Sequence, residues 1–189
     1  MKIILKNLAL ALLLLFPFTS YAASPEEQTN LFYQYVDTSQ WNKIADMLDN
    51  SALHEFKAKM LPLLNHEATN GRNGLLKRTF GKNAKFEDAQ NATDQVFFVN
   101  VISNVAGMIR NSGIKNTHTT IIGEVMEGDD VMHVLVRERY KLGDMEITNI
   151  EVLSYKQLNG SWAMLLSGKI RGLVQTLQTS MYQLRQRRR

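Results

Sequence analysis

The sequence predicts an α+β fold, in which amino-terminal helices pack on a curved four-stranded antiparallel meander and a C-terminal helix follows. Up to about residue 113, apolar residues recur mostly at helical spacing. From residue 117 to 167 the chain instead contains runs of β-forming residues separated by short turns. Two of these turns, Gly143-Asp144 and Asn159-Gly160, are two-residue hairpin signals. Hairpins joined in series give a meander.

Three helices are expected at the start of this domain. Ser24 begins a capping box with Pro25 at the first helical position, and a break at 37–39 separates the second helix. Ser51 is the expected cap of the third helix, and Pro62 is expected to kink or end it.

A polar stretch and a long helix complete the first half. Residues 65–92 are polar, with only Leu75, Leu76 and Phe80 expected to be buried. Thr93 can cap a long helix that Gly113 ends.

The strands are expected at four runs, and their turns determine which residues pair. The runs and the last helix are Thr117–Met126, Val131–Leu142, Met145–Leu158, Ser161–Ser167 and Lys169–Gln186. The tight turns set Glu138 opposite Asn149 and Val136 opposite Glu151, whereas the longer turn sets Val125 opposite Met132 less securely. The face expected to meet the helices carries Ile121, Val125, Met132, Val134, Val136, Tyr140, Ile147, Leu153, Tyr155, Trp162, Met164 and Leu166.

Three polar residues, Glu138, Asn149 and Glu151, fall on this apolar face, and a buried carboxylate needs a partner. One explanation is that this end of the sheet meets water. Another is that a helix-borne cation such as Arg72, Lys77 or Arg110 compensates the charge.

The functional alternative is a pocket between helices and sheet. Glu138, Asn149 and Glu151 would be its polar floor, and Tyr140, Tyr155 and Trp162 the remaining candidates for its lining.

The meander resembles that of the nuclear-transport-factor-2-like (cystatin-like) superfamily. The similar segments are Gly123–Val136, a charged turn before a long strand, and Leu153–Trp162, with an Asn-Gly turn before Trp. The resemblance implies helices that close over a concave sheet to form a cone-shaped cavity, in enzymes or in binding modules. A weaker resemblance, to periplasmic phospholipid-shuttling proteins of the toluene-tolerance type, concerns Trp162 and the helix after it.

Residues 1–22 predict a cleavable secretory signal peptide, so we expect an exported protein, periplasmic or secreted, with one domain at 23–189. A basic start is followed by the apolar run Leu8 to Phe18, and Ser20 and Ala22 supply small residues before the cut. The run is shorter than the roughly 20 residues of a membrane-spanning helix, which disfavours a retained anchor.

Composition excludes several kinds of chemistry. The chain has no cysteine, which rules out disulfides, thiol catalysis and cysteine-bound zinc. The net charge of +4 depends on arginines in the tail 185–189, so a nucleic-acid partner is not expected. The tail either complements the helix dipole or, in a sharper interpretation, contacts anionic lipid.

Neither a metal nor a cofactor is expected. The four histidines are scattered, and His133 is expected to pair with Glu124 on the outer sheet face. That face also carries an apolar set, which either forms a homodimer interface or is covered by the C-terminal helix. The set is Ile122, Leu135, Ile150, Val152 and Leu165.

Three functions agree with these observations. The leading hypothesis is a non-enzymatic binding or accessory module for a small apolar ligand or lipid. The second is an enzyme with Glu138 or Glu151 as general base and Tyr140 as hydrogen-bond donor. The third is a lipid carrier of the cell envelope that docks through the arginine tail.

Overall fold

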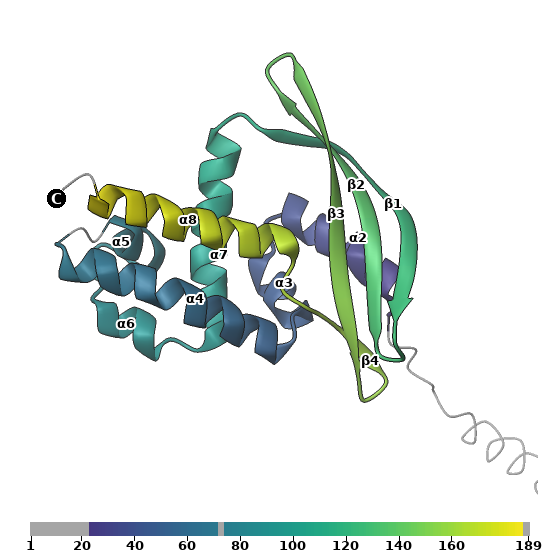
Figure 1. Ribbon diagram of the computed structural model, residues 1–189, viewed down its shortest axis with the longest axis horizontal. Coiled ribbons are helices and arrows are strands. Elements are labelled where there is room, and N and C mark those ends of the chain that lie inside the picture. Colours follow the sequence, from purple (N-terminus) through teal and green to yellow (C-terminus); the bar gives the residue numbers. More distant parts are fainter. Residues whose placement is uncertain (1–22, 72–73, 187–189) are drawn as a thin grey trace, which may run out of the picture.

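The computed structural model describes residues 23–71 and 74–186, and it confirms the α+β class (Figure 1). The helices in these ranges are α2 (Pro25–Asp37), α3 (Trp41–Met47), α4 (Asn50–Thr69), α5 (Gly74–Phe80), α6 (Phe86–Asn91), α7 (Asp94–Asn111) and α8 (Gly168–Gln186). The strands are β1 (Lys115–Glu127), β2 (Val131–Leu142), β3 (Met145–Leu158) and β4 (Ser161–Met164). The predicted signal peptide lies outside the described residues.

The amino-terminal helices begin largely where the capping signals place them. Ser24 forms the predicted capping box at α2, and the side chain of Thr93 caps α7. The cap of α4 was predicted wrongly: Asp49, not Ser51, is the N-cap, and its carboxylate accepts the backbone N–H of Ser51. Asp and Ser are comparable caps, so sequence alone does not choose between two so close together.

Two further predictions for the helical half were wrong or incomplete. Pro62 was expected to kink or end the third helix; α4 does not end there but continues to Thr69. The polar stretch 65–92 contains the short helices α5 and α6; Leu75 and Leu76 are buried as expected, whereas Phe80 is only partly buried.

An aromatic cluster between α4 and α7 forms the centre of the core. Phe56, Phe97 and Phe98 are fully buried, and the rings of Phe56 and Phe98 meet edge to face with their centroids 5.1 Å apart. Such a pair adds stabilisation beyond the apolar area that it buries. The core continues to the sheet through Val134, Val136, Leu153 and Tyr155, which are at most 1% exposed.

The sheet is the predicted meander in the order β1-β2-β3-β4. The β2–β3 register is the predicted one, with Glu138 opposite Asn149, Val136 opposite Glu151 and Tyr140 opposite Ile147. The β3–β4 turn also pairs Leu158 with Ser161 as expected, but β4 ends at Met164 instead of Ser167.

The register of β1 differs from the prediction. Met126 pairs with Met132, and Val125 pairs with His133 on the outer face, where Val125 is 55% exposed. The cause is an irregularity between Ile121 and Gly123 that shifts the remainder of the strand by one residue. A bulge of this kind moves every later side chain to the opposite face.

The described helices lie on one side of the sheet, with α2 behind β2 and β3 and α8 running away from β3 (Figure 1). The interpretation in which the C-terminal helix covers the outer face was therefore wrong, because α8 packs on α4 and β3. On that face, Ile122, Ile150 and Val152 are 41–47% exposed. Among the described residues, no helix is long and apolar enough to cross a membrane.

Candidate functional site

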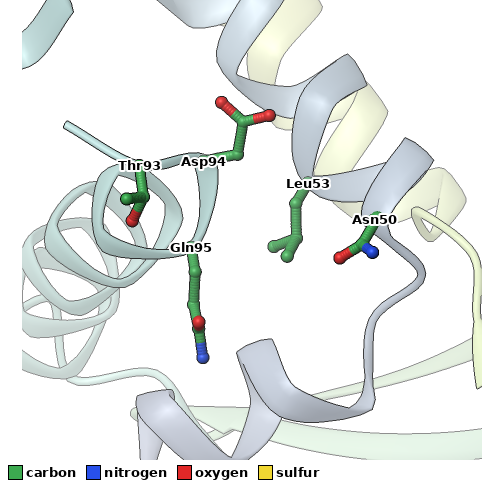
Figure 2. Close-up of a pocket in the computed structure, with 5 residues that line it drawn as sticks. All are labelled: Asn50, Leu53, Thr93, Asp94 and Gln95. Carbon is green, nitrogen blue, oxygen red and sulfur yellow. The ribbon is translucent and has the colours of Figure 1, made fainter. Parts of the chain in front are cut away.

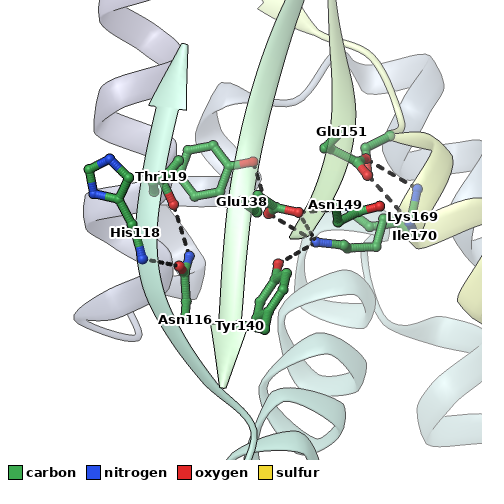
Figure 3. Close-up of polar contacts among 11 residues, drawn as sticks. Asn116, His118, Thr119, Glu138, Tyr140, Asn149, Glu151, Lys169 and Ile170 are labelled. Carbon is green, nitrogen blue, oxygen red and sulfur yellow. Dashed lines mark hydrogen bonds and ion pairs between the residues drawn. The ribbon is translucent and has the colours of Figure 1, made fainter. Parts of the chain in front are cut away.

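A polar cluster occupies the inner sheet face where Glu138 was predicted to lie (Figure 3). The Glu138 carboxylate is 2% exposed, and its oxygens lie 2.7 and 2.9 Å from the Lys169 ammonium. The same carboxylate accepts hydrogen bonds from the Tyr33 hydroxyl at 3.0 Å and from the Asn149 amide at 3.1 Å. The charge that appeared unpaired in the sequence therefore has four hydrogen bonds.

Lys169 is the residue that joins the cluster to the last helix. Its ammonium also lies 2.7 Å from the Tyr140 hydroxyl, and its backbone N–H donates to Glu151 at 3.3 Å. A helix-borne cation was thus the correct alternative, but it is supplied by Lys169 and not by the predicted residues. Lys77 and Arg110 lie elsewhere, with Arg110 bonded to Ser39, and Arg72 lies outside the described residues.

A signal for Lys169 was present in the sequence. The residue stands in the first turn of a helix, where a cation opposes the helix dipole. A lysine at such a position suggests a partner elsewhere. Tyr33 carries no comparable signal, because it is one of several aromatic residues in α2.

The two buried carboxyl groups have opposite pKa shifts. Burial favours the neutral form of Glu138, but hydrogen bonds and charge from Lys169 outweigh burial and lower its pKa. For Glu151, burial dominates and raises the pKa, because Lys169 offers this carboxyl only a backbone N–H and a more distant charge. The pKa of Lys169 is raised, since its bonds to Glu138 and Tyr140 outweigh its own burial.

These shifts bear on Glu138 as one of the two candidates for a general base. Glu138 is held ionised with its oxygens occupied by Lys169, Tyr33 and Asn149. A general base needs a free lone pair and a pKa near the working pH. The arrangement is instead that of a brace between α2, the sheet and α8.

The other two predicted pocket residues lie further along the inner face. Tyr155 is fully buried, and its hydroxyl is 2.8 Å from the hydroxyl of Thr29 in α2; burial raises its pKa. Trp162 is partly buried, and its carbonyl accepts a hydrogen bond from the Gln28 side chain at 2.7 Å. Four of the six candidates therefore surround Lys169, whereas Tyr155 and Trp162 join the sheet to α2.

Beyond the cluster, the inner face of the β2–β3 hairpin remains partly open. By register it carries Tyr140, Leu142, Met145 and Ile147 on one side. Met145 is 59% and Ile147 47% exposed, although the sequence predicted that Ile147 would be covered by helices. The opposite side of this segment is polar, with exposed Arg139, Lys141, Glu146 and Thr148.

A separate hollow of about 330 Å³ lies near the beginnings of α4 and α7, away from the predicted pocket (Figure 2). Its lining residues are Asn50, Leu53, Thr93, Asp94 and Gln95. Asp94 already contacts His54 at 3.1 Å and Lys57 at 3.4 Å. The Asp94 carboxylate of this hollow is thus engaged in contacts with α4.

On the outer face, His133 pairs with Glu127 at 2.6 Å and with the Ser154 hydroxyl at 2.8 Å. The predicted partner, Glu124, was wrong because the shift in β1 places it opposite Val134. Within residues 23–71 and 74–186, no group of three or more His, Asp or Glu residues is arranged to hold a metal ion.

Comparison of the chain with protein-family models, with curated proteins and with solved structures gave no match.

Proposed function

We propose that this chain is an exported, non-enzymatic binding module that holds a small apolar ligand or lipid against the inner face of the β2–β3 hairpin. The observation that carries the proposal is the exposure of Met145 and Ile147 on the face that elsewhere forms the core. Contiguous apolar side chains that stay exposed beside a polar rim are typical of ligand and protein interaction sites.

The polar cluster supports this proposal in two ways. Glu138 and Lys169 fasten α8 to the sheet, so the surface next to them is built on rigid elements. The Lys169 side chain is also 48% exposed and its ammonium contacts the Tyr140 hydroxyl. A positively charged group therefore lies at one end of the exposed apolar surface. A ligand with an apolar body and an acidic or polar head would match this order of groups.

The resemblance to the nuclear-transport-factor-2-like superfamily is part of the same proposal. In that superfamily the ligand cavity lies between the helices and the concave sheet face. In this chain Tyr140 and Ile147 lie on the sheet face that is turned toward the helices, although Ile147 itself is 47% exposed.

The test uses two isoleucines that differ in face but not in exposure. Ile147 on the inner face and Ile150 on the outer face are each 47% exposed. The probe is anilinonaphthalene sulfonate, which fluoresces in apolar sites and carries an acidic group. We expect Ile147→Asp to weaken binding of the probe about tenfold, equivalent to about 1.4 kcal/mol. Ile150→Asp is expected to leave the affinity unchanged.

Equal affinities of the two variants would reject the hairpin as the ligand site. Native mass spectrometry of the purified mature protein provides a second readout, because a co-purified lipid should be lost from the Ile147 variant and retained by the Ile150 variant.

A further inference from the structure

One edge of the sheet presents backbone groups that no other strand uses among the described residues. Of β3, only the end from Tyr155 to Leu158 pairs with β4, whereas β3 begins ten residues earlier at Met145. In Figure 1 the upper part of β3, toward the β2–β3 turn, has β2 on one side and no strand on the other.

Two hydrogen bonds identify the residues whose backbone groups point to this open edge. The Ser154 carbonyl accepts the N–H of Leu165 at 2.8 Å, so the backbone N–H and C=O of Ser154 point away from β2. The Gln157 N–H donates to the Asp130 carbonyl at 2.7 Å, so the backbone groups of Gln157 point toward β2. Since backbone direction alternates along a strand, Glu146, Thr148 and Ile150 direct both N–H and C=O to the open edge.

This edge lacks the devices by which sheets prevent further pairing. The β2–β3 ladder runs without a register shift from Val131 to Leu142, whereas β1, at the opposite edge, has two irregularities. The segment 145–152 contains neither Pro nor Lys, and of its two carboxylates Glu151 is buried. Long, regular and weakly charged edges are templates for the addition of a strand.

We infer that the open edge of β3, from Glu146 to Ile150, binds an extended peptide segment of a partner protein by strand addition. This interaction goes beyond the proposed apolar ligand site, because backbone groups recognise the peptide. The side chains beside the edge define the chemistry of the segment. Met145 and Ile147 on the inner face, and Ile150 and Val152 on the outer face, are 43–59% exposed. An added strand therefore gains contacts from apolar residues on both of its faces.

The path of α8 favours a single added strand over the sheet of a second copy. Helix α8 starts next to Glu151 and runs away from the sheet on the β3 side (Figure 1). The body of a second copy paired edge to edge would meet this helix, whereas an isolated strand beside Glu146 to Ile150 ends before it.

The experiment combines amide hydrogen exchange with a peptide of generic sequence. The probe is a short synthetic peptide of alternating valine and threonine, with lysine at both ends. In the free protein we expect fast exchange at Thr148 and Ile150, and slow exchange at Ile147 and Asn149, whose N–H groups point to β2. Saturating peptide should slow exchange at Thr148 and Ile150 at least tenfold. A peptide with N-methylated backbone on its pairing side should have no effect.

A proline substitution provides the matched variant. Thr148→Pro removes an N–H that the β2–β3 ladder does not use, so the variant should keep the fold but bind the peptide at least tenfold more weakly. Thr148→Val keeps this N–H and should bind the peptide with unchanged affinity. Circular dichroism checks folding, and the exchange pattern of the unmodified protein remains decisive should the proline variant unfold.

Three results would overturn the inference. These are no saturable binding up to the solubility limit of the peptide, equal binding by the two Thr148 variants, or a dimer in which Thr148 and Ile150 are already protected without peptide.

Discussion

Replacement of Lys169 by methionine removes the cation from the buried cluster while preserving most of the side-chain volume. Glu138 would keep its bonds to Tyr33 and Asn149 but lose the two to the ammonium. We expect the variant to fold with reduced stability, because an ionised carboxylate that is 2% exposed would no longer face a countercharge.

The size of the effect follows from the unequal burial of the pair. Removal of one partner from a fully buried ion pair costs about 3–5 kcal/mol. Lys169 is 48% exposed and Glu138 retains two donors, so the expected loss is smaller, about 2 kcal/mol at neutral pH.

The stability lost on replacement of Lys169 should depend on pH. In the native protein the pKa of Glu138 is lowered, so its contribution to stability is present above the unfolded value of 4.5 and is lost as the pH falls through the folded value. Without Lys169, burial raises this pKa instead. The deficit of the variant should therefore be largest at neutral pH and shrink on acidification.

The assay is urea denaturation at neutral pH and near pH 4, followed by the fluorescence of Trp41 and Trp162. The additional substitution Glu138→Gln should recover about half of the lost stability, because it removes the unpaired charge. A deficit below about 0.5 kcal/mol, or one that grows on acidification, would refute the assignment of Lys169 as the countercharge.

Three further predictions concern other contacts. Glu151→Gln should stabilise the protein more at pH 7 than near pH 4 in the same assay. The reason is that the pKa of Glu151 is raised, so its ionisation is unfavourable in the folded state. Equal changes in stability at the two pH values would contradict this. Tyr155→Phe should cost about 1–2 kcal/mol of unfolding free energy, since it leaves the buried Thr29 hydroxyl without its partner, and a neutral substitution would reject that bond. Arg171→Ala should cost less than about 1 kcal/mol, because Arg171 and Glu55 are both partly exposed. Arg171 and, to a smaller extent, Lys59 lower the pKa of Glu55 to about 2, so carboxyl titration by NMR should show this pKa rise in the variant, and an unchanged pKa would contradict the Arg171 contact.

The parts of the fold that depend on local rules were predictable from sequence. Two-residue turns fix pairing, so the neighbours of Glu138 and Glu151 across β2 and β3 could be assigned correctly. The longer turn before Val131 fixes pairing less strongly, and the irregularity near Ile122 has no sequence signal beyond a glycine. The positions of Glu124 and Val125 were wrong for that reason.

The site was predictable only on its sheet side. Period-two alternation placed Glu138, Asn149 and Glu151 together, but alternation says nothing about which helix residue reaches them. The partner depends on how α8 leaves β4, which is a tertiary property. Lys169 was therefore missed, although a cation in the first turn of a helix is unusual. The predicted contact of the arginine tail with lipid concerns side chains outside the described part of the chain.

The proposed ligand contacts the inner and not the outer face of the β2–β3 hairpin. The most direct measurement is a titration of isoleucine-methyl-labelled protein with anilinonaphthalene sulfonate, followed by NMR. We expect the Ile147 methyl resonance to shift in a saturable manner while that of Ile150 stays in place. Saturable shifts of Ile150 with Ile147 unmoved would contradict it.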